Sequence, residues 1–128
     1  MISDTTIINC GTSQDTYDSE CGAIETQANS GPIKNITFTN IDIIDSQRSA
    51  IQVGYGGGYT GVVFNNINID GTGLDAITTS RFAVPHGGAA FFSYTGSGTV
   101  TFNNLTYVNV ETNPPMIIPS GVNVIINP

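Results

Sequence analysis

The chain has 128 residues, of which 10% are charged, and its ten acidic residues face three basic ones for a net charge of −7. So few basic side chains exclude a nucleic-acid-binding surface or an anionic-membrane surface, because both depend on the neutralisation of phosphate groups. This length suits a single domain that covers residues 1–128.

The composition is rich in Gly, Asn, Thr and Ile and poor in Lys and helix formers, which is typical of an extracellular β-protein. No apolar run approaches the ~18 residues that cross a bilayer. The segment Met1-Ile2-Ser3 has neither the basic region nor the apolar stretch of a secretory signal. We therefore expect a secreted protein whose signal is not contained in this chain.

Two cysteines, Cys10 and Cys21, flank a polar segment near the beginning of the chain. A disulfide between them would stabilise the fold by roughly 2–3 kcal/mol. The alternative is two unpaired cysteines. The chain has no Cys-x-x-Cys pattern and His86 is its one histidine, so we predict no metal site and no cofactor.

One strand pattern recurs at residues 35–44, 61–70 and 99–108. Apolar or aromatic residues alternate with polar ones in each copy, which predicts a strand with one buried face. Each copy also has an Asn two residues after a Phe. Asn at a fixed place in a strand favours a bend, because it tolerates the left-handed conformation better than most residues. A unit of strand, bend and strand repeated along a chain predicts a solenoid.

The same unit extends towards both ends of the chain. We predict that its central apolar residues are equivalent, namely Ile7, Phe38, Phe64, Phe102 and Val124. The interval between the last two is about one turn of a three-sided parallel β-helix, and the longer intervals carry loop insertions. An Asn follows each of the first four centres by two positions, and we expect these residues to stack as a column on the axis of the coil, namely Asn9, Asn40, Asn66 and Asn104.

A second strand follows each of these units. Its equivalent segments are predicted at residues 23–25, 50–52 and 76–78, with Met116 beginning the next one. Alternation turns the Ile of each segment inward, so that Glu25, Gln52 and Thr78 form an outward row. A third strand is predicted at residues 89–94.

These patterns predict an all-β fold, a right-handed single-stranded parallel β-helix of about four to five coils. We expect a partial helix, because residues 1–8 begin in mid-coil and leave an open apolar edge. Upstream coils of the same protein, or end-to-end self-association, would cover that edge.

The insertions between strands hold the rarer residue types. Tyr55 and Tyr59 lie in a glycine-rich segment, and tyrosine rings stack on the apolar face of a pyranose; a simple turn between coils explains the same glycines. Arg81 and His86 lie in the insertion at residues 80–88 and are candidates to hold sugar hydroxyls or a carboxylate. The alternative is an Arg81 ion pair and a solvated His86.

Hydrolysis of a glycosidic bond uses two carboxylates roughly 5–10 Å apart. Neighbouring strands lie about 4.8 Å apart, so acids on nearby coils meet this condition. The acidic candidates are Asp15, Asp18, Glu20, Glu25, Asp45 and Asp75. No motif distinguishes any of them, and we assign no catalytic residue. The residues predicted to bind a substrate are Glu25, Gln52, Tyr55, Tyr59, Asp75, Arg81 and His86.

Three segments carry a resemblance to a known family, namely residues 31–52, 70–81 (Asp-Gly-Thr-Gly to Ser-Arg) and 85–90 (Pro-His-Gly-Gly-Ala-Ala). They resemble bacterial α-1,3-glucanases of the mutanase and mycodextranase type, glycoside hydrolase family 87. The resemblance implies a secreted catalytic β-helix that cleaves α-1,3-linked glucan with aspartates, of which this chain would form the C-terminal coils. The family's adjacent Asp-Asp pair has no counterpart here, which implies that this piece alone is inactive.

Three functional hypotheses follow. The chain is the C-terminal part of a polysaccharide hydrolase and shapes one end of its α-glucan groove. Alternatively it is a non-catalytic carbohydrate-binding β-helix, or a structural solenoid that stacks end to end.

Overall fold

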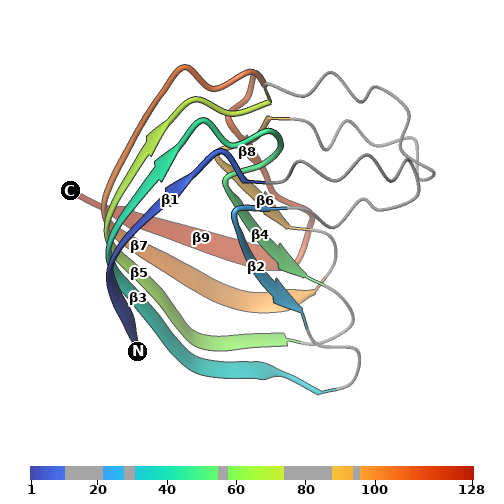
Figure 1. The fold of residues 1–128 in the computed structure, drawn as a ribbon. Coiled ribbons are helices and arrows are strands. Elements are labelled where there is room, and N and C mark those ends of the chain that lie inside the picture. The colour runs from blue at the N-terminus through green and yellow to red at the C-terminus, as the bar shows by residue number, and fades with distance from the viewer. Residues whose placement is uncertain (11–21, 28–30, 55–57, 74–87, 94–95) are drawn as a thin grey trace.

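The computed structural model describes residues 1–10, 22–27, 31–54, 58–73, 88–93 and 96–128, which form two parallel β-sheets (Figure 1). The first sheet has the order β1 (Ile2–Ile8), β3 (Ile33–Ile44), β5 (Gly58–Asp70), β7 (Ser97–Val108) and β9 (Val122–Asn127). The second has the order β2 (Ile24–Gln27), β4 (Ile51–Gly54), β6 (Phe91–Ser93) and β8 (Met116–Ile117). None of the described residues forms a helix able to cross a membrane.

Successive strands enter the two sheets alternately, so each coil adds one strand to both. All strand pairs are parallel, from β1 with β3 to β7 with β9 and from β2 with β4 to β6 with β8. A chain that winds in this way is a parallel β-helix, and the fold prediction is confirmed. The division of the chain into a single domain stays a prediction.

Stacked phenylalanines form the centre of the core. Phe38, Phe64 and Phe102 are register partners on β3, β5 and β7, and neighbouring rings lie 4.9 Å apart between centroids. Phe91 of the second sheet meets Phe102 edge-on at 5.3 Å, which links the two sheets across the interior. The predicted equivalence of these three phenylalanines is therefore correct.

The predicted alignment of the two ends is wrong by a few residues. Ile7 pairs with Ile43, and Val124 pairs with Val100, whereas the partners of the phenylalanine column are Ile2 and Ile126. Val124 is two residues before Ile126, and Ile7 is five residues after Ile2, with the left-handed Asp4 of the bend taking the odd place between them, so both shifts leave inward side chains on the inward face. Alternation alone therefore identifies the buried face but not the register.

The second sheet confirms part of the expected equivalence. Ile24 pairs with Ile51, and Phe91 pairs with both Ile51 and Met116. The segment expected to be a third strand therefore includes β6, which occupies the next position in the second sheet. Residues 76–78, expected in this place, lie outside the described part of the chain.

Left-handed residues bend the strands of the first sheet. The main bend consists of residues with positive φ on four neighbouring strands: Asp4 (52°), Asn40 (55°), Asn66 (51°) and Asn104 (59°). Inward residues on either side of this bend, such as Phe38 and Ile41, are three positions apart instead of two, because the left-handed residue takes the additional place. The prediction that Asn marks a bend is confirmed.

These bend residues form a hydrogen-bonded row on the outside of the first sheet. Asn104 Nδ2 donates to Asn66 Oδ1 at 3.1 Å, Asn66 Nδ2 donates to Asn40 Oδ1 at 2.8 Å, and Asn40 Nδ2 donates to Asp4 Oδ1 at 2.8 Å. All four residues are exposed, so the row lies on the surface. The prediction that these asparagines stack on the axis of the coil is therefore wrong. Asn9 is not a member and lies at a later bend, where its backbone N–H donates to the carbonyl of Ile44.

Asn66 tests how much this row contributes to stability. Replacement by alanine forces a Cβ-bearing residue with no amide into the left-handed region, and we expect the free energy of unfolding to fall by about 1–3 kcal/mol. The matched variant Asn66→Gly loses the same side-chain hydrogen bonds without the backbone strain, so it should be about 1 kcal/mol more stable than the alanine variant. Urea unfolding measures both. Equal midpoints for the two variants would show that the left-handed conformation does not determine the choice of Asn.

Candidate functional site

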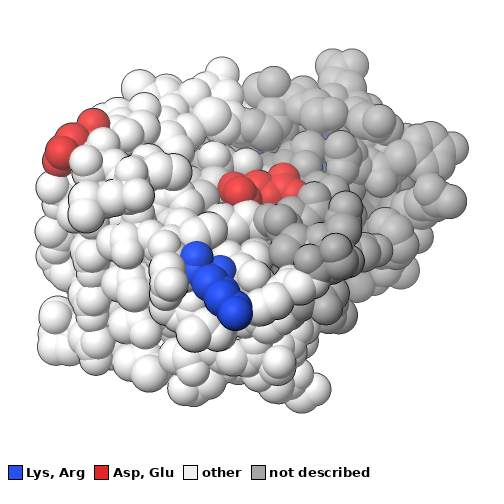
Figure 2. Space-filling view, turned by 90° about the horizontal axis from the view of Figure 1, so that it is seen from below, with Lys and Arg blue, Asp and Glu red and all other residues white. Residues whose placement is uncertain are grey.

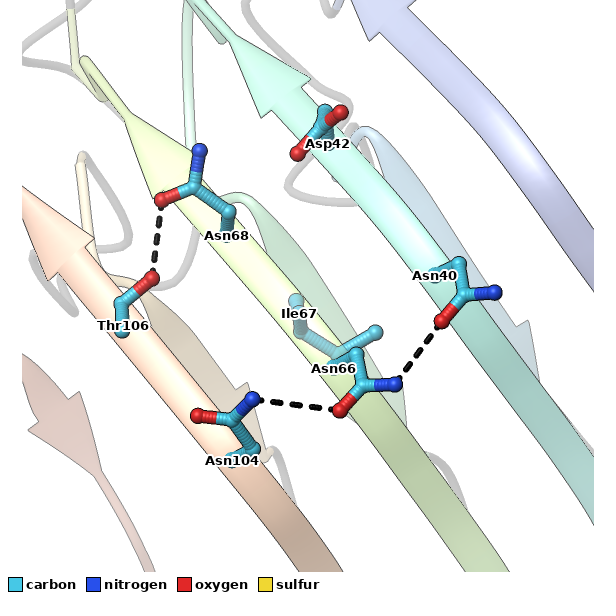
Figure 3. A pocket seen from close by; sticks show the side chains of 7 residues that line it. All are labelled: Asn40, Asp42, Asn66, Ile67, Asn68, Asn104 and Thr106. Carbon is cyan, nitrogen blue, oxygen red and sulfur yellow. Dashed lines mark hydrogen bonds between the residues drawn. The ribbon is translucent and has the colours of Figure 1, made fainter. Parts of the chain in front are cut away.

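The outside of the first sheet carries a hollow of about 280 Å³, formed by β3, β5 and β7 (Figure 3). Two rows of side chains cross the three strands at this place. The seven lining residues are Asn40, Asn66 and Asn104 in the first row, Asp42, Asn68 and Thr106 in the second, and Ile67 between them. We call this hollow the amide groove.

Strand geometry explains why the two rows share a face. Ile41, Ile67 and Leu105 pair across the strands and pack into the interior or against it. Because successive side chains in a strand alternate between faces, the residues before and after these three point outward. Six polar lining residues of the groove thus follow from one short repeat of polar, apolar and polar residues.

The first row is occupied by its own hydrogen bonds. Asn40 and Asn66 each donate through Nδ2 and accept through Oδ1 within the row, which fixes both amides (Figure 3). In the second row, Thr106 Oγ1 donates to Asn68 Oδ1 at 2.8 Å. The bond uses Asn68 Oδ1 and leaves Asn68 Nδ2 free of side-chain hydrogen bonds among the described residues. The exposed carboxylate of Asp42 also makes no side-chain hydrogen bond within this part of the chain.

Asp4 ends the first row with a negative charge. The hydrogen bond from Asn40 and a second one from Ser3 lower the pKa of the Asp4 carboxyl below its ordinary value of 3.8, and these bonds outweigh the small effect of burial. The Asn40 amide thus stabilises the ionised form of the Asp4 carboxylate, which ends the first row on β1.

Acid titration tests this arrangement. Because the pKa of Asp4 is lower in the folded chain than its ordinary 3.8, its contribution to stability is complete above that pH and is lost as the pH falls further. Asp4→Asn should therefore reduce the drop in the urea midpoint between about pH 5 and pH 3. An unchanged pH dependence would contradict the role of the Asn40 hydrogen bond. Asp42→Asn, which removes a carboxylate outside the first row, is the matched control.

Three of the predicted substrate-binding residues are described, and none of these three lines the amide groove. Glu25 is exposed on β2, in the second sheet. Its register partner Gln52 is 3% exposed, so the expected outward row is not solvent-accessible at this position. Four others, Tyr55, Asp75, Arg81 and His86, lie outside the described residues.

Tyr59 is buried, which corrects its predicted role as a platform for sugar stacking. The side chain is 3% exposed and belongs to the hydrophobic core, and its hydroxyl lies 3.5 Å from Ser93 Oγ. Burial raises the pKa of the Tyr59 hydroxyl, and the hydrogen bond with Ser93 offsets only part of this effect. A ring in this position packs against its neighbours and presents no face to a ligand.

Among the remaining acidic candidates, only Asp45 is described, and it does not line the groove. Asp45 is exposed at a left-handed bend after β3, whereas Asp15, Asp18 and Glu20 lie outside the described residues. Cys10 is a free thiol just after β1, whereas Cys21 lies outside the described residues, so the pairing of the two cysteines stays a prediction. Within the described part of the chain, no three His, Cys, Asp or Glu side chains are grouped to hold a metal ion.

Figure 2 shows few charged side chains on this face of the molecule. Most of its described surface is formed by uncharged residues, drawn in white. The amide groove has the same character, since Asp42 is its one charged lining residue. The described lining of the groove therefore offers amides, one hydroxyl and one carboxylate, and no cation for a phosphate or carboxylate ligand.

A solved structure resembles the chain in sequence and in fold. The chain is similar to the crystal structure of the Agl-KA catalytic domain, with 58% sequence identity and a TM-score of 0.87. The match covers 98% of this chain and 22% of that chain, so the chain spans about a fifth of the matched structure. No family model and no curated protein matched. Almost the whole chain is thus similar, in sequence and in backbone path, to one part of that catalytic domain.

Proposed function

We propose that this chain forms part of the catalytic domain of a polysaccharide-degrading glycoside hydrolase that resembles α-1,3-glucanases. The observation that carries the proposal is the match to a catalytic domain at 58% identity over 98% of the chain. Two parts of the described structure agree with it, namely the parallel β-helix and a groove lined by amides, a hydroxyl and one carboxylate. In this proposal the chain shapes one end of the glucan groove, and the protein acts outside the cell.

The catalytic acids lie in the rest of the domain. The matched structure is several times longer than this chain, and glycoside hydrolysis needs two carboxylates on the same face at a defined separation. Within the described residues, Asp42 is the one carboxylate that lines the groove. We therefore expect the purified chain to release no reducing sugar from α-1,3-glucan.

A chimaera tests the proposal directly. This chain replaces the matching segment of the Agl-KA catalytic domain, and hydrolysis of that domain's own substrate is measured. We expect a folded, active chimaera, because the two segments share their backbone path and more than half of their residues. A chimaera that is folded by circular dichroism but inactive would contradict the proposal. Turnover by the isolated chain would contradict the placement of the acids.

The edges of the sheets support a contact with further coils. Ile2 and Ile8 on the edge strand β1 are 50% and 60% exposed, and Ile125 and Ile126 on the opposite edge strand β9 are 40% and 52% exposed. We propose that upstream coils of the same protein cover β1, since an open parallel edge exposes both apolar side chains and backbone groups. End-to-end stacking of copies is the alternative. Light scattering on the isolated chain distinguishes the two alternatives. End-to-end stacking predicts an apparent mass that rises steadily with concentration, whereas coverage by upstream coils does not require such a rise.

A further inference from the structure

We propose that Asp42 and Asn68 form a sugar-binding subsite in the amide groove, at which the carboxylate accepts a hydrogen bond from one hydroxyl of a glucose unit and the amide donates to a neighbouring hydroxyl. This inference rests on the proposed function and assigns it to two residues. The ligand class is an uncharged oligosaccharide of glucose.

The two side chains are neighbours on one face. Asp42 of β3 and Asn68 of β5 are register partners in a parallel pair, and both are exposed. Adjacent strands lie about 4.8 Å apart, which places a carboxylate and an amide side by side. Vicinal hydroxyls of a pyranose are spaced closely enough to contact both groups at once.

Both side chains have hydrogen-bonding groups left for a ligand. Asp42 makes no side-chain hydrogen bond within the described part of the chain, and a carboxylate only accepts, so it suits the proton of a hydroxyl. Asn68 uses Oδ1 to accept from Thr106, and this bond directs Nδ2 towards the other side of the residue (Figure 3). The amide is therefore oriented before a ligand arrives, which lowers the entropic cost of binding.

The opposite wall of the groove is rigid. Asn40 and Asn66 are fixed by hydrogen bonds on both sides, and each keeps one Nδ2 hydrogen that the row does not use. A sugar between the rows would thus meet a carboxylate and a free amide on one side and fixed amide donors on the other. Among the residues that the structure describes, no aromatic side chain lines the groove, so the proposed binding depends on hydrogen bonds and not on stacking.

The row direction favours a chain of sugars over a single one. Thr6, Asp42, Asn68 and Thr106 are successive register partners on β1, β3, β5 and β7. This row runs across the strands and therefore along the axis of the coil. A glucan that follows the axis would present successive sugars to successive strands, with the subsite at the middle of the described stack.

Other ligand classes fit the groove less well. Anions are disfavoured, because the lining residues include a carboxylate and no Lys or Arg. A divalent cation would need further carboxylate or imidazole ligands, and Asp42 has no such companions among the described residues. A hydroxyl-rich neutral ligand matches the available donors and acceptors.

Amide NMR titration with a soluble tetramer of α-1,3-linked glucose tests the subsite. We expect the backbone signals of Asp42, Asn68 and their strand neighbours to shift on binding. Asp42→Ala and Asn68→Ala should each weaken the affinity by roughly tenfold or more, because each removes a hydrogen bond that a charged or oriented group makes to the sugar. Asp42→Asn provides a variant of unchanged shape, with a smaller loss.

The matched control is Asn123→Ala on β9, an exposed strand asparagine that does not line the groove. It should leave the affinity within twofold. The dispersion of the amide NMR signals of each variant shows whether the fold is retained. We expect it to be retained, because substitutions of exposed residues usually change stability little. Binding that Asp42→Ala and Asn68→Ala do not weaken, or no shift of the groove signals at any sugar concentration, would overturn the subsite. Neither result affects the chimaera, whose activity tests the proposed function separately.

Discussion

Replacement of Phe64 by alanine is expected to lower the free energy of unfolding by about 3–5 kcal/mol. The ring of Phe64 is fully buried and lies between Phe38 and Phe102, with 4.9 Å between centroids on both sides. Its removal leaves a cavity that two stacked neighbours line, and the register of three strands holds those neighbours in place. A domain of this size has a total stability of about 5–15 kcal/mol, so the loss is a large fraction of the whole.

Urea unfolding followed by circular dichroism measures this loss. Ile2→Ala is the matched control, because Ile2 is the register partner of Phe38 in the same column but is 50% exposed at the edge. We expect it to cost about 1 kcal/mol. If the alanine variant of Phe64 is too unstable to purify, Phe64→Leu retains most of the volume and should give an intermediate midpoint. A Phe64 loss no larger than that of Ile2 would contradict a core built by stacked coils.

The repeat could be predicted from the sequence because two signals coincide in it. Alternation identifies the buried face, and the fixed Phe and Asn positions at 38, 64, 102 and 40, 66, 104 identify the register. Strand β1 has no Phe, and the Asp4 that replaces Asn in the bend resembles any other exposed acid. Register at this end therefore depends on the left-handed conformation of Asp4, which alternation does not reveal.

Tyr59 shows why the candidate site was harder to predict. It is one of two tyrosines beside three glycines, which favours a flexible exposed loop. However, Tyr59 and Val62 flank the left-handed Gly61 in the same way that Ile33 and Ile36 flank the left-handed Asn35, and these residues pair across β3 and β5. Alignment of Gly61 with Asn35 would have placed the tyrosine ring inside.

The groove itself gives no strong signal in the sequence. Rare residue types such as Arg81 and His86 lie in the insertions, whereas the groove consists mostly of common polar residues within the strands. Asn40, Asn66 and Asn104 were identified, but as a structural column. The residues two positions later, Asp42, Asn68 and Thr106, differ from one another, so only the register of the folded chain shows that they form a row.

Gly98 should tolerate no side chain, and Gly98→Ala is expected to cost about 3–5 kcal/mol. Its φ is +119°, a conformation that residues with a Cβ rarely adopt, and a Cβ built there would clash with the carbonyl oxygen of Tyr59. The obstacle is the backbone of the neighbouring strand, which rotation of a side chain does not relieve. Gly98 pairs with Tyr59 on β5 and with Val122 on β9, so a local shift would disturb two strand pairs at once.

Gly31→Ala separates the two components of this cost. Gly31 also has a positive φ, at +96°, but a Cβ there would meet no atom within 4 Å. The control variant therefore carries the conformational strain alone, of order 1–3 kcal/mol. Urea midpoints of the two variants are compared with that of the unmodified chain, and the additional loss at Gly98 measures the steric contact between coils. Equal losses at the two sites would contradict the prediction, because they would show that the contact between Gly98 and the Tyr59 backbone adds no cost to the conformational strain.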